Sequence, residues 1–220
     1  AEALAAEAEA RMYDADAQKL AAQAQKLAAE AEQCEVNSRS MTRKEKDELA
    51  SNKYHHVYAF NDPVFAGSVG ACMSQLNIWA RNEPSCDIEI VFNSPGGSVI
   101  DGMALYDFIQ MLRRKGHKIT TGTMGMAASM AGILLQAGDV RYIGKESYLL
   151  IHEISTGAVG KIGEIEDTVE FVKKIQKRVI QIFAARSNKS ATYFEKHWRR
   201  KDWWLSSSEA MEIGIVDEIR

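Results

Sequence analysis

The chain has 220 residues, and its 30 acidic against 27 basic side chains leave a net charge of −3. This nearly even balance, without a strongly basic block, argues against nucleic acid as a partner. No apolar run approaches the eighteen or so residues that a membrane-spanning helix needs, and no secretory signal precedes the core, so we expect a cytoplasmic protein without membrane partners.

The front of the chain predicts a helical extension. Residues 1–33 consist mostly of Ala, Glu and Gln, without Gly or Pro, a composition typical of one long exposed helix. Leu20 and Leu27 lie seven residues apart, but this stripe is too short to define a coiled coil. We therefore expect a mainly solvated helix that pairs at most weakly with a partner.

A break in the helical pattern follows this extension. Residues 37–40 predict a linker, and Thr42 to Glu45 forms a capping-box pattern that opens a second short charged helix. We assign residues 1–52 to the helical extension and residues 53–220 to a second domain.

Short apolar strands alternate with amphipathic helices through the second domain, whose roughly 165 residues can bury a substantial core. We expect strands near residues 56–60, 87–92, 118–123, 140–144 and 147–152, and helices near 67–81, 99–114, 127–137 and 161–187. This alternation favours an α/β fold with mostly parallel strand pairing.

Three features of this domain together indicate a serine hydrolase. A serine hydroxyl needs a base and hydrogen-bond donors for the developing oxyanion. Ser129 stands where a strand is expected to give way to a helix, whose first N–H groups lack partners. The turn Asn93 to Gly97 exposes further N–H groups, and His152 ends an apolar strand. Each feature alone has an ordinary structural interpretation: helix packing, a connecting turn and a buried histidine.

The sequence predicts neither a cofactor nor a metal. The glycine pattern of a dinucleotide site and the Gly-Lys-Ser/Thr of a phosphate-binding loop are both missing. Cys34, Cys72 and Cys86 are odd in number and lack metal-ligand spacing, which fits a reducing compartment. The pair His55 and His56 lacks acidic or thiol partners for zinc.

Several motifs in the same order resemble the ClpP family of serine peptidases, the proteolytic subunits of Clp proteases. The resemblance runs from about Tyr54 to Ile219. It rests on Ser94 to Gly97 (Ser-Pro-Gly-Gly), Ala127 to Met130 (Ala-Ala-Ser-Met), Leu150 to His152, Asp202 to Ser206 and the ending Ser208 to Asp217. It implies a crotonase-like fold of repeated β-β-α units.

The resemblance also implies the roles of individual residues. Ser129 would be the nucleophile, His152 the general base and then acid, and Asp202 the group that orients the imidazole. The backbone N–H groups of Gly97 and Met130 would form the oxyanion hole.

Polypeptide substrates would bind as an added strand between two segments. One is Gly97 to Ile100, with Gly96, Ser98, Val99 and Ile100 as contact residues, and the other is Ser155 to Gly160. The chain departs from the family pattern at three places. Glu153 and Ile154 stand where the family has Gln and Pro after the histidine, and Ala131 stands where it has Gly. The bulky Trp203 and Trp204 replace the usual Arg and aromatic pair.

The resemblance further implies a ring-shaped homo-oligomer. An apolar stripe runs along residues 161–186, and in the family this helix joins two rings of seven subunits, so a heptameric ring or double ring is expected. The family's short axial loop, which contacts an ATP-driven AAA+ unfoldase, has no recognisable counterpart. A helix before a Clp-type core is reminiscent of phage head-maturation proteases, which would make capsid proteins the partners and a procapsid in the host cytoplasm the location.

Four functions therefore remain open. The first is a ClpP-type serine endopeptidase, and the second is a phage head-maturation protease of the same superfamily that acts without an unfoldase. The third is a crotonase-fold acyl-CoA enzyme, which needs oxyanion N–H groups but no triad. The fourth is a catalytically silent scaffold subunit with a misaligned triad.

Overall fold

The computed structural model describes residues 2–220, apart from the side chains of residues 2–10 and of Ala15. Residue 1 of the predicted extension lies outside the described residues. The chain divides into two compact units between His55 and His56, and each unit is described by itself.

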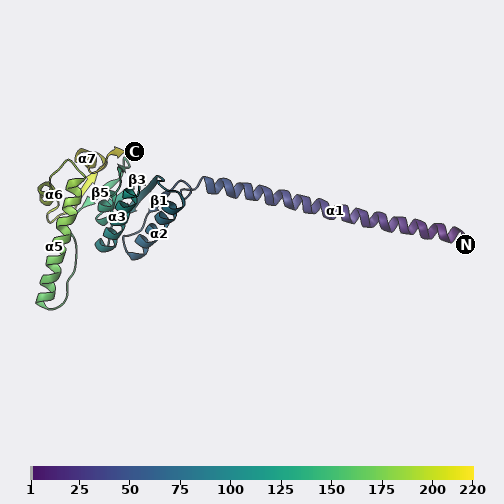
Figure 1. Cartoon of the computed structure of the whole chain (residues 1–220), viewed down its shortest axis with the longest axis horizontal. Coiled ribbons are helices and arrows are strands. Elements are labelled where there is room, and N and C mark those ends of the chain that lie inside the picture. Colours follow the sequence, from purple (N-terminus) through teal and green to yellow (C-terminus); the bar gives the residue numbers. More distant parts are fainter. Residues whose placement is uncertain (1) are drawn as a thin grey trace. The chain divides into compact units, whose positions relative to one another are not determined.

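The first unit consists mainly of one continuous helix, α1 (Glu2–Leu49), of 48 residues (Figure 1). The predicted N-terminal helix is confirmed, but the linker at residues 37–40 and the separate second helix are wrong. The Asn, Ser and Arg side chains there cost little in a helix. Thr42 Oγ1 donates to the Ser38 carbonyl (3.0 Å) instead of capping a new helix, and Gln33 Nε2 donates to Asn37 Oδ1 (3.2 Å).

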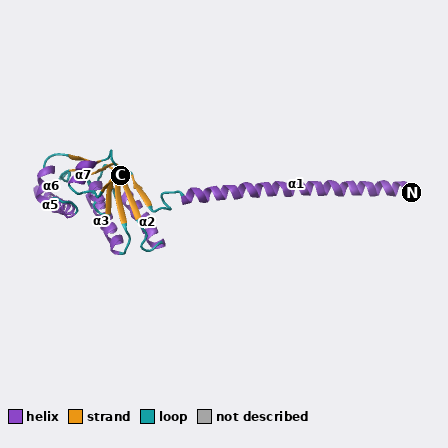
Figure 2. Ribbon diagram, turned by 90° about the horizontal axis from the view of Figure 1, so that it is seen from above, coloured by secondary structure: helices purple, strands orange, loops and turns teal. Residues whose placement is uncertain are grey.

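The second unit is an α/β domain, as expected. Its elements are β1 (Val57–Phe60), α2 (Ala66–Asn82), β2 (Ile88–Ser94), α3 (Val99–Arg114), β3 (Ile119–Ala128), α4 (Met130–Leu135), β4 (Val140–Ile143), β5 (Tyr148–Ile151), α5 (Ile162–Ala185), α6 (Ala191–Trp198), β6 (Trp203–Ser206), α7 (Ser207–Glu212) and β7 (Glu218–Ile219). The strands form one sheet with helices packed against it (Figure 2).

The sheet runs in the order β1-β2-β3-β4-β7, with β5 on β3 and β6 on β5. Every pair of strands is parallel except β5 with β6. Predominantly parallel pairing is therefore confirmed. Helices α2, α3 and α4 pack in one layer against the sheet, whereas Glu89, Val91 and Asn93 on the other face of β2 are only partly buried or exposed. The buried core includes Leu76 of α2, Ile109 of α3, Phe92 of β2 and Phe183 of α5.

β3 bends in the middle and pairs with two strands on the same edge. Its first half, Thr120 to Thr123, pairs with β4, and its last three residues pair with β5. The bend lies at Gly125, whose φ of +96° suits glycine. A Cβ at this position would lie only 2.6 Å from Asn93 Oδ1. The bend therefore lets β4 and β5 occupy successive parts of one edge.

The predicted end of β3 at Thr123 and start of the next helix at Ala127 are wrong. Ala127 and Ala128 belong to the strand, pairing with Leu149 and Leu150 of β5, and α4 begins at Met130. The sheet hydrogen bonds of these two alanines outweigh their intrinsic helix preference.

An ion pair between the buried Arg141 and the partly exposed Asp217 joins the end of the chain to the sheet. Arg141 of β4 is 5% exposed, and its Nε lies 2.9 Å from Asp217 Oδ2, which also accepts the Arg141 backbone N–H at 2.8 Å. Burial alone raises the pKa of Asp217, but the hydrogen bonds and positive charge of Arg141 outweigh it and hold this pKa below its ordinary value. The pair thereby anchors β7 beside β4.

Replacement Arg141→Met is expected to lower the free energy of unfolding by about 2 kcal/mol, because the buried Gln136 amide oxygen loses its donor and the partly exposed Asp217 loses its ion pair. Urea unfolding at fixed protein concentration measures the loss. Lys174→Met, which removes an exposed pair with Glu170, should change stability by less than about 0.5 kcal/mol. Equal effects of the two replacements would contradict a structural role for the pair of Arg141 with Asp217.

The stability that Asp217 contributes also has a defined pH dependence. Because its folded pKa is lowered, this contribution is present above the unfolded pKa of about 3.9 and is lost as the pH falls through the folded value. The difference between the parent chain and Arg141→Met should therefore shrink on acidification.

Candidate active site

Ser129 occupies a strained turn between β3 and α4. Its φ of +54° and ψ of −121° are uncommon for a residue with a side chain. The backbone N–H of Ser129 donates to the Leu150 carbonyl at 2.9 Å, which fixes the turn to β5. Although Ser129 is the N-cap residue of α4, its side chain does not cap the helix. The hydroxyl is therefore free of a structural role at this helix end.

The register of three neighbouring strands brings the predicted triad together. Ala128 pairs with Leu150 in the parallel β3–β5 ladder, so Ser129 follows β3 beside the end of β5, where His152 follows Ile151. Ile151 pairs with Trp203 in the antiparallel β5–β6 ladder. The next pair in that register is His152 opposite Asp202.

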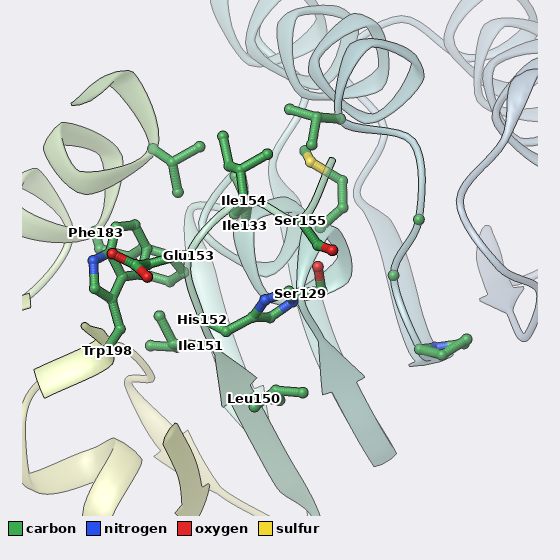
Figure 3. A pocket seen from close by; sticks show the side chains of 16 residues that line it. Ser129, Ile133, Leu150, Ile151, His152, Glu153, Ile154, Ser155, Phe183 and Trp198 are labelled. Atoms are coloured by element: carbon green, nitrogen blue, oxygen red, sulfur yellow. The ribbon is translucent and has the colours of Figure 1, made fainter. Parts of the chain in front are cut away.

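Ser129 and His152 line one cavity of about 360 Å³. Figure 3 shows the Ser129 hydroxyl beside the His152 ring, with Ile133, Ile154, Phe183 and Trp198 among the apolar walls. Asp202 lines a neighbouring hollow of about 430 Å³, which His152 also lines. His152 therefore lines both hollows, one together with Ser129 and the other together with Asp202.

The three side chains are near one another but are not yet connected. Among the hydrogen bonds of residues 2–220, none joins the Ser129 hydroxyl to His152 or His152 to Asp202. The strand register places these three residues at adjacent strand ends, without a hydrogen bond between their side chains in the described structure.

Two backbone donors face the same cavity. Val64 N–H donates to the Gly96 carbonyl (2.8 Å) and Ser98 N–H to the Val64 carbonyl (2.7 Å), so in this extended segment Gly97 N–H points the other way. Met130 is the first residue of α4, where N–H groups have no acceptor within the helix. Within residues 2–220 neither N–H has a hydrogen-bond acceptor, and both residues line the cavity.

Gly97 requires glycine at this position. Its φ is +149°, and a Cβ there would collide with the Val64 carbonyl. Because the segments around Val64 and Gly97 approach each other closely, the backbone at Gly97 is held in place and its N–H is a fixed donor.

The segment Gly97 to Ile100, which is expected to pair with a substrate strand, runs from the glycine turn into helix α3. Ser98 is the N-cap of α3, its hydroxyl accepting from Asp101 N–H at 3.3 Å, so Val99 and Ile100 belong to the first helical turn. The first N–H groups of a helix have no acceptor within it, so this turn keeps free backbone donors. The cavity lining includes Gly96 and Val99 but neither Ser98 nor Ile100.

The other segment expected to bind substrate, residues 155–160, has an exposed backbone that a substrate strand could pair with. Residues 155–160 form no helix or strand and are mostly exposed. In the part of the chain that the structure describes, their backbone N–H groups have no acceptor. Ser155 also lines the cavity.

Glu153 has a structural role that sequence reasoning missed. Its Oε2 accepts the backbone N–H of Arg200 at 3.0 Å, and Arg200 has a φ of +55° in the turn before Asp202. This contact connects the residue after His152 to the turn that carries the aspartate. The only sequence signal was the departure from the family's Gln at this position.

No group of three His, Cys, Asp or Glu side chains in residues 2–220 could hold a metal ion, and no helix there is long and apolar enough to cross a membrane. Burial raises the pKa of the Cys72 and Cys86 thiols, which disfavours a reactive thiolate. Cys86 Sγ instead lies 3.5 Å from His117 Nδ1 in the interior.

Known proteins resemble this chain over most of its length. The Clp protease family profile matches residues 45–220. The ATP-dependent Clp protease proteolytic subunit of Bacteroides fragilis is 38% identical over 62% of this chain, which spans 65% of that protein's length. The corresponding subunit of Porphyromonas gingivalis is 36% identical over 84% of this chain and 82% of its own length. Proteolytic subunit 2 of Tropheryma whipplei is 36% identical, with coverage of 72% and 86%. The chain belongs to the Clp protease family.

Proposed function

We propose that the protein is a ClpP-type serine endopeptidase that cleaves polypeptides in a ring-shaped homo-oligomer. Ser129 Oγ attacks the substrate carbonyl while His152 takes its proton, and the oxyanion accepts hydrogen bonds from Gly97 and Met130 N–H. His152 then returns the proton to the leaving amine, so the peptide bond breaks and an acyl-serine forms. Water, deprotonated by His152, releases the acyl product and restores the serine. Asp202 orients the imidazole throughout.

The observation that carries this proposal is the coincidence of strand register and unpaired donors. The β3–β5 and β5–β6 ladders bring Ser129, His152 and Asp202 to neighbouring positions. Two backbone N–H groups without an acceptor among residues 2–220 line the same cavity. A strained serine that does not cap its own helix supports the role of nucleophile over that of a packing residue.

Ser129→Ala is expected to abolish labelling by a fluorophosphonate probe and cleavage of unfolded polypeptide, since no other group supplies the nucleophile. Intact mass and peptide cleavage provide the two readouts. Ser155→Ala is the matched control, because Ser155 lines the same cavity and should keep full labelling (Figure 3).

The assay also distinguishes the remaining functions. Cleavage of a folded protein without any added ATPase favours the second candidate, a phage-type maturation protease in a procapsid, which the long helix α1 before the core supports. An assembled parent chain that never reacts with the probe would sink the peptidase proposal and favour the silent scaffold. Binding of a coenzyme A thioester at the two free N–H groups would favour the crotonase-type enzyme.

Glu153 is proposed to hold the Asp202 turn in the position that catalysis needs. Glu153→Leu removes the acceptor of Arg200 N–H, and a hydrogen bond to a charged group is worth about 1.5–3 kcal/mol. Hydrogen exchange of the Arg200 amide should accelerate about tenfold or more, and probe labelling of Ser129 should slow.

Glu153→Gln keeps an acceptor oxygen and should resemble the parent in both measurements. Unchanged amide exchange in Glu153→Leu would contradict a positioning role for this side chain.

The exposed half of α5 supports the proposal of assembly. Val179, Ile180, Ile182 and Phe183 are buried in the domain core. Toward the start of the helix, however, Ile162 is 78% exposed, Phe171 52% and Val169 42%. In Figure 1 this part of α5 extends away from the sheet. We propose that it packs against α5 of a neighbouring copy, as expected for the family, and that this packing aligns the triad.

The paired change Val169→Glu and Phe171→Glu is expected to reduce the assembled fraction, because it places charges in the proposed apolar interface. Light scattering measures the particle mass. Lys173→Glu, at an exposed position two residues after Phe171, is the control and should leave the mass unchanged. Persistence of the full-sized particle in the double variant would contradict assembly through α5.

A further inference from the structure

Because α1 is continuous, it carries one long apolar stripe, which the predicted linker at residues 37–40 would have interrupted. Because the helix runs unbroken through Ser40, one set of positions recurs every seven residues over four heptads. This α1 seam consists of Tyr13, Leu20, Leu27, Cys34 and Met41, alternating with Ala17, Ala24, Ala31 and Ser38. It ends where Glu45 and Glu48 take the next two positions.

The large side chains of the α1 seam are strongly exposed. Leu20 is 71% exposed, Leu27 61%, Tyr13 68% and Met41 72%, and Cys34 is also exposed. Of the other large apolar side chains between residues 11 and 45, Met12 and Val36 lie off the seam. A long helix gains most of its stability from burying such a face, so an uncovered seam over about 42 Å of helix indicates a missing partner.

We propose that the α1 seam pairs with α1 of a second copy of this chain in an antiparallel two-helix coiled coil. The size pattern of the seam selects both the partner and the direction. In an antiparallel pair each small position faces a large one: Ala24 faces Leu27 of the second copy and Ala31 faces Leu20, with Ser38 next to the hydroxyl-bearing Tyr13. Every layer then has similar volume, which close packing requires.

A parallel pair in register would pack the same residues poorly. Layers of two alanines would alternate with layers of two leucines, so the wide layers would hold the narrow ones apart. At the flank, Ala21 of one helix then lies beside Ala28 of the other, which allows close approach, whereas Asp14 lies beside Glu35 and their like charges weaken the pair. Small residues at the seam and its flank allow the helix axes to approach to about 8 Å.

The pairing can be tested with the exposed Cys34 as a reporter. In the antiparallel register Ala17 faces Cys34 of the second copy, whereas two Cys34 residues lie 17 residues apart along the axis, about 26 Å. The same distance separates Ala17 from Cys34 within one helix. A disulfide between positions 17 and 34 can therefore form only between two chains.

Full-length Ala17→Cys is oxidised mildly with diamide, and the linked peptides are identified by mass spectrometry. The expected product is an intermolecular 17–34 disulfide. Ala22→Cys, the same change on the opposite face of the helix, is the control and should give about tenfold less cross-linking, as random collision would. Adding Leu20→Lys and Leu27→Lys to Ala17→Cys should abolish the product.

Three outcomes would overturn the proposal. A Cys34–Cys34 disulfide in the parent chain would indicate a parallel pair. Equal yields from Ala17→Cys and Ala22→Cys would indicate collision without a defined seam. Absence of any cross-link in Ala17→Cys would show that α1 does not pair with its own copy. Because Ser129 takes no part in the readout, the result does not depend on the proposed peptidase activity.

Discussion

The parallel pairing of β3 with β5 is the constraint on which the site depends. β3 must bend at Gly125 so that β4 and β5 can both pair along its edge. The bend brings Ala128 beside Leu150, and the Leu150 carbonyl then holds the Ser129 N–H in its strained turn. Without this ladder nothing would hold Ser129 at a positive φ instead of an ordinary helical or extended conformation, and His152 would not lie beside it.

The same pattern of backbone hydrogen bonds explains the two free donors. Nearly all buried N–H groups in a protein find acceptors. Here the bridge between Val64 and Gly97 uses the backbone groups on one side of the turn, and at the start of α4 the Met130 N–H has no acceptor among residues 2–220. Both donors face the cavity that Ser129 and His152 line. Such preorganised donors cost no rearrangement when charge develops on a reacting oxygen, which is why we propose them as an oxyanion hole.

Local sequence patterns predicted a helix or strand correctly where the tertiary contacts of the segment favour the same structure as its own residues do. The strands around residues 56–60 and 87–92 and helix α3 were anticipated closely, because their apolar periodicity is set by burial on the sheet. The α/β class and the N-terminal helix were also anticipated. Where the prediction failed, distant contacts or side-chain compensation decided the outcome. Ala127 and Ala128 became strand through pairing with β5, and the polar residues 37–40 stayed helical through bonds to their own turn.

The site shows the same division between local and distant information. Ser129 and His152 stand out because a turn or a strand end surrounds them, whereas Asp202 and Gly97 gain meaning only from resemblance and from the fold. Nothing near Asp202 in the sequence reveals that the β5–β6 register places it opposite His152. Glu153 could not be assigned at all, since its partner Arg200 lies 47 residues away. The α1 seam was visible only once the helix proved continuous.

The central claim is that strand register assembles Ser129, His152, Asp202 and two backbone donors into one catalytic site. A crystal structure of the assembled protein after reaction with a fluorophosphonate tests it most directly. The account predicts phosphorus bonded to Ser129 Oγ, its oxygen about 3 Å from both the Gly97 and Met130 nitrogens, and the His152 ring within hydrogen-bond distance of Asp202. An adduct on another residue, or a phosphonyl oxygen turned away from both nitrogens, would contradict it.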